Sequence, residues 1–279
     1  MSSYSTIPKF LAPRDEMGYD QKVPRIIWQT MKTNLVPVIM YDYASSWIEL
    51  NPDYEYRLHD DNDVIAFIKN DFPDYLEAYN KIKYGASKAD LWRYLIMYKY
   101  GGVYIDMDCR CIKPLRQWID PGAEFVTQLG INKDICQWMI ISVPNNPIFL
   151  KAAQKALQNI EQNTCLAAYH GFEFTNGKIV IRENDPPVSF NDKVLGLAGP
   201  PVLQEAAEVC FREGSISGIL SFTQIVCVSK VRSCQMNGNV AHDTGDDNYI
   251  KALGILKTPY YGRLISRMIR KFFPPLYLR

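Results

Sequence analysis

The feature that most constrains this chain is a helix pattern that meets two glycines and continues at once as a strand. Ser87 resembles the start of a capping box, which predicts a helix that runs to Tyr100. Gly101 and Gly102 then end that helix. Residues 103–108 predict a short apolar strand that ends in two aspartates. The segment therefore predicts a helix packed next to the strand that follows it.

Strand and helix patterns alternate through at least residue 160. Residues 23–30 are β-branched and aromatic and too few for a helix, so they predict a first core strand. A helix is predicted over residues 42–50 and a half-buried strand over residues 54–58. Residues 60–63 are expected to cap a helix that reaches Ile68. This alternation predicts an α/β fold with helices on both sides of the sheet.

The composition fits a folded protein that is nearly neutral. The chain has 279 residues, 47% of them hydrophobic, with 31 Lys and Arg against 30 Asp and Glu. These values argue against a disordered chain and a general polyanion binder, so no nucleic-acid partner is expected. The apolar runs are far shorter than the roughly 18 residues of a membrane span. Seven cysteines without a Cys-x-x-Cys pair, and no Asn-x-Ser/Thr sequon, favour a cytoplasmic location.

Asp106 and Asp108 are the residues that predict chemistry. Side chains alternate along a strand, so Tyr104, Asp106 and Asp108 are expected on one face. Two carboxylates at a strand end can hold a hard divalent cation, and that cation can bridge a diphosphate. The competing interpretation is an ordinary acidic surface turn. Close carboxylates repel each other unless a cation offsets them, which favours the metal site.

Two stretches around this pair resemble a known family. They are residues 86–94, with the sequence Ala-Ser-Lys-Ala-Asp-Leu-Trp-Arg-Tyr, and residues 101–108, with the sequence Gly-Gly-Val-Tyr-Ile-Asp-Met-Asp. Together they are similar to the DxD region of family 32-type glycosyltransferases. That group includes fungal initiating mannosyltransferases and, more distantly, the clostridial glucosylating toxins. The likeness is dense from about residue 23 to residue 116.

The resemblance implies a fold and a domain organisation. It implies an α/β fold of GT-A type, a single domain with a Rossmann-like mixed sheet flanked by helices. That domain would span residues 23–256. Residues 1–22 would form an N-terminal extension, and residues 257–279 a basic amphipathic C-terminal tail.

The resemblance also implies a site. Asp106 and Asp108 would hold Mn²⁺ or Mg²⁺ against the diphosphate of a UDP-sugar or GDP-sugar donor. Arg93 would act in catalysis with these two aspartates by offsetting the charge that develops on the leaving phosphate. The residues implied to bind the donor are Trp28, Gln29, Asp90, Arg93, Tyr104 and Gln137.

The sequence departs from the family pattern at two places in the site. His242 is the candidate third metal ligand, but Asp246 and Asp247 stand where the family has Ser-Trp. The third ligand is therefore His242, Asp243 or neither. Gln137 stands where the family has asparagine, so the identity of the sugar does not carry over.

These residues predict a metal-dependent glycosyltransferase that moves a hexose to a glycan, lipid or protein acceptor with retention. One alternative is a non-catalytic module on the same fold that binds a nucleotide sugar or a glycan. Another is a haloacid-dehalogenase-type phosphatase, but more than 100 residues precede a motif that normally follows the first strand. Competing interpretations of single residues are an exposed ion pair for Asp90 and Arg93, and a core aromatic for Tyr104.

The C-terminal tail is basic. No acidic residue follows Asp247, whereas seven Lys and Arg residues do. Apolar residues interleave them, which predicts an amphipathic helix. Such a helix suits either peripheral contact with an anionic membrane surface or docking on the domain.

Overall fold

A computed structural model describes residues 4–15, 20–111, 113–117, 119–129, 134–175, 178–189, 193–215 and 234–236. His242 and residues 257–279 lie outside the described residues. The predicted domain boundaries and the predicted tail therefore stay predictions. In the part of the chain that is described, no helix is both long and apolar enough to cross a membrane.

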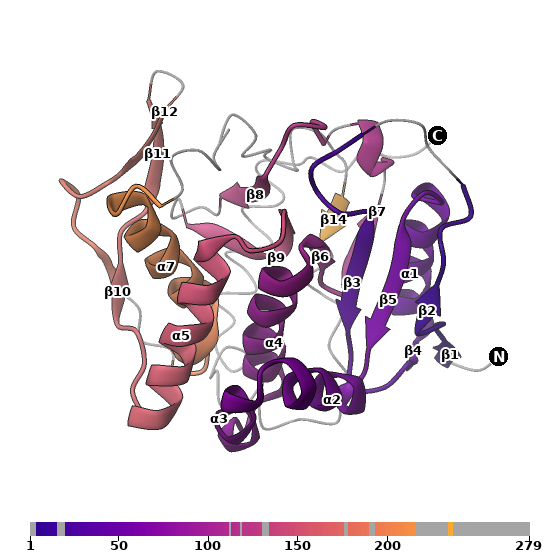
Figure 1. Ribbon diagram of the computed structural model, residues 1–279, viewed down its shortest axis with the longest axis horizontal. Coiled ribbons are helices and arrows are strands. Elements are labelled where there is room, and N and C mark those ends of the chain that lie inside the picture. Colours follow the sequence, from indigo (N-terminus) through magenta and orange to yellow (C-terminus); the bar gives the residue numbers. More distant parts are fainter. Residues whose placement is uncertain are drawn as a thin grey trace, which may run out of the picture. The chain divides into compact units, whose positions relative to one another are not determined.

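A six-stranded mixed sheet organises the described fold (Figure 1). Its strands, in spatial order, are β2 (Phe10–Leu11), β5 (Glu55–His59), β3 (Ile26–Thr30), β6 (Gly102–Ile105), β9 (Ile135–Ser142) and β8 (Phe125–Leu129). β5, β3 and β6 are parallel to one another. β2, β9 and β8 each run antiparallel to their neighbours. The predicted α/β class with a mixed sheet is confirmed.

Helices cover both faces of this sheet, as predicted. α1 (Val38–Leu50) packs on the face that carries Ile27. The helices on the other face, with Trp28, are α2 (Asp61–Asp71), α3 (Leu76–Lys81), α4 (Gly85–Tyr100), α5 (Pro147–Gln162) and α7 (Pro200–Arg212). Because consecutive strand residues point to opposite faces, Ile27 and Trp28 belong to two different cores.

Short elements complete the described part of the fold. Antiparallel two-stranded pairs join β1 (Tyr4–Thr6) to β4 (Leu35–Pro37), β10 (Ala168–Tyr169) to β13 (Val188–Ser189), β11 (Phe172–Thr175) to β12 (Lys178–Ile181), and β14 (Cys234–Met236) to β7 (Cys109–Cys111). The remaining helices are η1 (Pro73–Tyr75), η2 (Leu115–Gln117) and α6 (Leu195–Ala198). β1 and β2 lie within residues 1–22, so this stretch contributes one edge strand to the main sheet.

Two local predictions agree with the structure. β5 buries Tyr56 and Leu58 between half-buried neighbours, which is the alternation that the sequence predicts. α2 begins with a capping box in which an Asp60 side-chain oxygen accepts from the backbone N–H of Asp63 at 3.1 Å. The Asp63 carboxylate in turn accepts from the backbone N–H of Asp60 at 3.0 Å. These bonds satisfy N–H groups that would have no partner within the helix.

The predicted start of α4 is wrong. The helix begins at Gly85, so Ser87 lies inside its first turn rather than at its cap. The Ser87 side chain is buried and its hydroxyl donates to the carbonyl of Val194 at 3.2 Å. A tertiary partner has therefore replaced the local bond that the sequence pattern suggests.

Candidate active site

The predicted metal-binding carboxylates lie at the carboxyl end of β6, in a turn rather than in the strand. β6 ends at Ile105, and the backbone N–H of Cys109 donates to the carbonyl of Asp106 at 3.2 Å. The prediction of a strand through Asp108 is therefore wrong, because this bond turns the chain from β6 into β7. Strand alternation holds only as far as Tyr104 and Asp106, whose side chains meet in a 2.6 Å bond from the Tyr104 hydroxyl to Asp106 Oδ1.

Arg93 lies between two carboxylates. Its Nη2 is 3.1 Å from Oδ1 of Asp90 and 3.3 Å from Oδ1 of Asp106. Its guanidinium also lies over the ring of Tyr104, 4.4 Å from the centroid. Asp90 is 5% exposed and Arg93 is 6% exposed. The interpretation of these two residues as a surface ion pair is therefore wrong, because both are part of a buried charged network.

Gln137 joins this network from the adjacent strand β9. Its backbone carbonyl accepts from Nη1 of Arg93 at 2.7 Å. Its side-chain Nε2 donates to Oδ1 of Asp90 at 3.1 Å and to the hydroxyl of Tyr94 at 2.7 Å. The structure thus brings together five of the predicted residues, which are Asp90, Arg93, Tyr104, Asp106 and Gln137.

Tyr94 is the member of this network to which the sequence assigned no role. It follows Asp90 by four residues, so both side chains lie on the same side of α4. This spacing is the one signal in the sequence that links it to Asp90. Its partner Gln137 is 43 residues away, which no local pattern can reveal.

Burial controls the protonation of these groups. It raises the pKa of Asp90 from the ordinary 3.8 to about 7, although the positive charge of Arg93 opposes the shift. Burial also raises the pKa of Tyr104 well above its ordinary range, so its hydroxyl keeps its proton and donates to Asp106. For Arg93, burial acts to lower the pKa, but the neighbouring acidic groups outweigh it and the pKa is raised.

Trp28 and Gln29 lie on opposite faces of β3. The buried indole of Trp28 donates from Nε1 to the carbonyl of Gly101 at 2.9 Å and packs against His59 with the ring centroids 5.5 Å apart. The buried Gln29 accepts from the hydroxyl of Tyr56 at 2.8 Å, and its Nε2 approaches the Asp106 carbonyl at 3.4 Å. Gln29 therefore contacts the turn that holds the carboxylates. Contact of either residue with a nucleotide stays a prediction.

The carboxylate pair suits a hard divalent cation. The Asp106 side chain is 31% exposed, and both of its contacts among the described residues fall on Oδ1. Asp108 is half-buried in the same turn. No group of three His, Cys, Asp or Glu side chains that could hold a metal occurs among the described residues. His242, the predicted third ligand, lies outside the described residues.

Comparison with known protein families matches the segment that contains these carboxylates. Residues 37–124 match the model of a family described as a glycosyltransferase sugar-binding region containing a DXD motif. Residues 37–124 are therefore similar to a DXD-containing sugar-binding region. This match agrees with the resemblance to family 32-type glycosyltransferases. Asp90, Arg93, Tyr104, Asp106 and Asp108 all lie within the matched segment, whereas Gln137 lies beyond its end.

The curated relatives share this region and extend well beyond the matched part. A mannosyl phosphorylinositol ceramide synthase of Saccharomyces cerevisiae is 36% identical over 148 residues, which cover 51% of this chain and 36% of that protein. An inositol phosphoceramide mannosyltransferase of Schizosaccharomyces pombe is 44% identical over 93 residues, which cover 33% of this chain and 26% of that protein. The chain therefore spans well under half of the length of these relatives.

Solved structures resemble the chain only distantly. The UDP-bound glycosyltransferase domain from the YGT toxin has a TM-score of 0.46 and 10% sequence identity. The alignment covers 70% of this chain and 79% of that domain.

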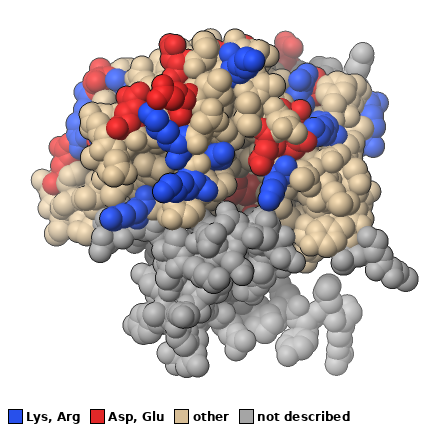
Figure 2. Space-filling view, turned by 90° about the horizontal axis from the view of Figure 1, so that it is seen from below, with Lys and Arg blue, Asp and Glu red and all other residues tan. Residues whose placement is uncertain are grey.

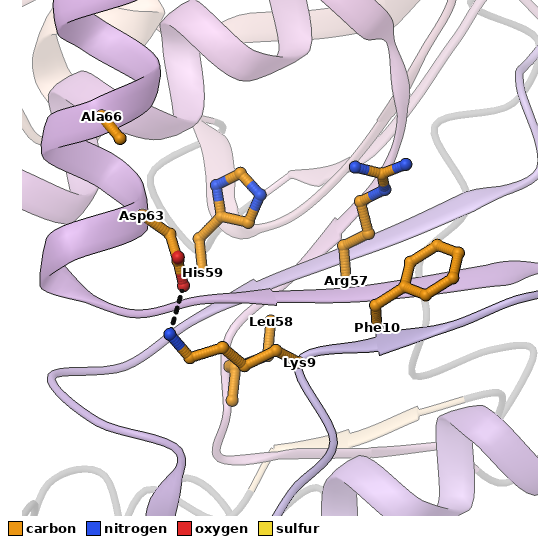
Figure 3. Close-up of a pocket in the computed structure, with 7 residues that line it drawn as sticks. All are labelled: Lys9, Phe10, Arg57, Leu58, His59, Asp63 and Ala66. Carbon is orange, nitrogen blue, oxygen red and sulfur yellow. Dashed lines mark ion pairs between the residues drawn. The ribbon is translucent and has the colours of Figure 1, made fainter.

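A separate pocket lies beside β2 and β5, away from Asp106 and Asp108 in the sequence (Figure 3). It has a volume of about 280 Å³ and is lined by Lys9, Phe10, Arg57, Leu58, His59, Asp63 and Ala66. Lys9 forms an ion pair with Asp63 at 2.8 Å across it. None of the predicted site residues lines this pocket, so it is not the candidate active site.

Charged side chains of both signs are mixed on the face seen from below (Figure 2). α2 lies at the bottom of Figure 1, so this face includes the side on which β5 ends. Among the residues drawn in colour, no area of a single sign dominates this view.

Proposed function

We propose that the protein is a metal-dependent glycosyltransferase of GT-A type that transfers a hexose from a UDP-sugar or GDP-sugar with retention. The observation that carries this proposal is the buried Arg93 guanidinium, which contacts both Asp90 and Asp106 at the carboxyl end of β6. A buried cation next to a partly exposed carboxylate suits a site where negative charge must be stabilised. The match of residues 37–124 to a sugar-binding region supports the same function.

Arg93 would act on the leaving group. Departure of the nucleoside diphosphate places negative charge on its phosphate oxygens. A guanidinium already fixed by Asp90, Asp106 and the carbonyl of Gln137 needs little reorganisation to stabilise that charge. Asp90 would accept hydrogen bonds from hydroxyl groups of the donor sugar, and its bond to Gln137 would fix the direction of that carboxylate.

Asp106 and Asp108 would hold the divalent cation. Their hard carboxylate oxygens match the ligand preference of Mn²⁺ and Mg²⁺, and Tyr104 orients Asp106 through its hydroxyl. When bound, the cation would neutralise charge on the donor diphosphate.

His242, the candidate that the sequence offers, stays the proposed third ligand. Histidine nitrogen is a common metal ligand, which is compatible with this role.

Mannose is the first sugar to test. The relatives include inositol phosphoceramide mannosyltransferases and initiation-specific α-1,6-mannosyltransferases. We propose by analogy that the sugar is mannose and that the acceptor is a lipid with an inositol phosphate head group or a glycan. Retention follows from the resemblance to family 32-type enzymes, and the anomeric configuration of the product, measured by NMR, would test it.

The test of the function is binding and turnover of nucleotide sugars. Thermal unfolding would be measured with UDP, GDP, UDP-glucose and GDP-mannose, each with Mn²⁺ and with EDTA. A ligand that binds only the folded state raises the melting temperature, so one nucleotide should give a shift that requires Mn²⁺. Asp108→Asn should abolish that shift, whereas Asp74→Asn, at an exposed aspartate, should keep it.

Donor hydrolysis separates the enzyme from the binding module. Without an acceptor, a glycosyltransferase should slowly release free sugar from its donor, and Arg93→Met should suppress this release. A shift in melting temperature without any release of sugar would favour the non-catalytic module. No shift with any of the four nucleotides would contradict the proposed function.

A further inference from the structure

We propose that Tyr94 is a positioning residue that acts through the side-chain amide of Gln137 and holds the Asp90 carboxylate in place for the donor sugar. The inference rests on the proposed function, because Asp90 is the residue proposed to bind the sugar. It also changes the role expected for Gln137, from direct contact with the donor to support of Asp90.

The hydrogen bonds form one continuous chain. The hydroxyl of Tyr94 donates to the carbonyl of Ala198 at 2.6 Å. Nε2 of Gln137 donates to that hydroxyl at 2.7 Å and to Oδ1 of Asp90 at 3.1 Å. The chain therefore runs from the end of α6, through α4 and β9, to the carboxylate in the candidate active site.

The donors and acceptors allow only one direction along this chain. The Tyr94 hydroxyl has one hydrogen, which the Ala198 carbonyl accepts, so towards Gln137 the hydroxyl must act as an acceptor. The Gln137 amide has two hydrogens, and Tyr94 and Asp90 are its two nearest acceptors. When Asp90 is ionised, a reversed amide would place its oxygen against the carboxylate, where two acceptors would face each other.

Burial makes each member necessary. Asp90, Tyr94 and Gln137 are all buried, so water cannot readily replace a missing partner. The Ala198 end of this hydrogen-bond chain is also fixed, because the N–H of the next residue, Gly199, donates to the carbonyl of Leu195 at 2.7 Å. Removing the Tyr94 hydroxyl would leave one Gln137 hydrogen with only the more distant Ala198 carbonyl, at 3.5 Å, as an acceptor, and turning towards that carbonyl would move the amide away from Asp90.

The test compares nucleotide sugars with nucleotides that lack the sugar. Binding of GDP, GDP-mannose, UDP and UDP-glucose would be measured by calorimetry in the presence of Mn²⁺. Tyr94→Phe should weaken binding of the matching nucleotide sugar by up to about tenfold, which is the upper end of the loss expected for one neutral hydrogen bond. Binding of the nucleotide alone should not change. Tyr79→Phe, which removes the hydroxyl of another buried tyrosine, should change neither.

A second variant shows whether Tyr94 acts through Gln137. Gln137→Met keeps the approximate volume of the side chain and removes its donor hydrogens, so it should give the same loss for the nucleotide sugar. The double variant should bind no more weakly than Gln137→Met alone, since the effects of residues in one chain are not additive. Gln137→Met also serves as the test if Tyr94→Phe does not fold.

Three results would overturn the inference. If the variants lost affinity equally for the nucleotide and for the nucleotide sugar, the effect of the substitutions would be merely structural. Additive effects of the two substitutions would show that Tyr94 does not act through Gln137. Variants that bind the sugar donor like the wild type would reject this inference alone, whereas a wild type that binds none of the four nucleotides would reject the proposed function with it.

Discussion

The hydroxyl of Tyr104 donates a 2.6 Å hydrogen bond to Oδ1 of Asp106, two residues further along the chain. Tyr104→Phe keeps the ring beneath Arg93 and removes only this bond. We expect Mn²⁺-dependent donor hydrolysis to fall about tenfold, because the bond orients a charged group. Hydrolysis at the wild-type rate would show that the hydroxyl does not orient Asp106. Tyr79→Phe is the matched control.

Substitutions of Arg93 should separate its structural role from its catalytic role. Arg93→Met leaves the carboxylates of Asp90 and Asp106 without their buried partner, so the free energy of unfolding should fall by about 3–5 kcal/mol. Arg93→Lys keeps the charge but cannot reach both carboxylates and the Gln137 carbonyl together, so it should lose donor hydrolysis with a smaller loss of stability.

Urea unfolding and donor hydrolysis would measure these two effects. Arg182→Met, which breaks an exposed ion pair with Asp185, should change the free energy of unfolding by about 1 kcal/mol or less. If Arg93→Met lowered the free energy of unfolding by no more than Arg182→Met does, the buried charged network would be contradicted.

The stability of the protein should depend on the protonation of Asp90. Its pKa is about 7 in the folded chain and near 3.8 in the unfolded chain, so between these values the folded chain binds the extra proton. Stability therefore falls as the pH rises from about 4 to 7. Relative to Asp90→Asn, the free energy of unfolding of the wild type should fall by roughly 3 kcal/mol between about pH 4 and pH 7.

Denaturant unfolding of both proteins at pH 4.5 and pH 8 would check the direction of this change. Asp74→Asn is the control, because Asp74 is exposed. A difference between wild type and Asp90→Asn that is the same at both pH values would contradict the shifted pKa.

Two glycines at the ends of α4 should respond to substitution in opposite ways. At Gly101, φ is +61° and an added Cβ would lie 2.5 Å from the carbonyl oxygen of Ser142. Gly101→Ala should therefore destabilise the fold by more than about 1 kcal/mol. At Gly85 an added Cβ would have no neighbour within 4 Å, so Gly85→Ala should be neutral or slightly stabilising. Melting temperatures would distinguish the two, and equal effects would contradict the close packing at Gly101.

The basic tail gives the last prediction. We expect its apolar face to dock on protein, so co-sedimentation with phosphatidylserine vesicles should be the same with and without residues 259–279. Sedimentation that is lost on truncation would instead support peripheral membrane contact. Neutral phosphatidylcholine vesicles are the control, because only anionic surfaces attract a basic helix strongly.

Local sequence signals predicted the elements whose stability is local. The Asp60 capping box and the alternation of Tyr56 with Leu58 are both satisfied by residues that are near in sequence. Ser87 fits the same capping pattern but bonds to Val194, 107 residues away. The pattern fails there because the helix begins at Gly85, so the Ser87 hydroxyl lies inside the first turn and donates to a buried carbonyl instead of accepting from a helix N–H group.

The site was predicted largely through the family resemblance. Asp90, Arg93 and Asp106 meet as that resemblance implies, but the alternation argument for Asp108 failed because the chain turns after Ile105. The support that Tyr94 and Gln137 give to Asp90 could not be predicted, since it depends on how β9 packs beside α4.

The direct passage from α4 into β6 has a consequence for the spacing of the site. From Asp90 to the end of α4 the helix rises about 15 Å, and from Gly102 to Asp106 the chain returns about 13 Å. The carboxylates of Asp90 and Asp106 lie close to each other because the rise along the helix and the opposite rise along the strand are nearly equal. One residue inserted into α4 after Asp90 would turn that residue by about 100° around the helix axis and move it about 1.5 Å along the axis. Insertions and deletions between residues 91 and 105 should therefore separate Asp90 from Asp106, and they should also destabilise the fold because most of this stretch is buried.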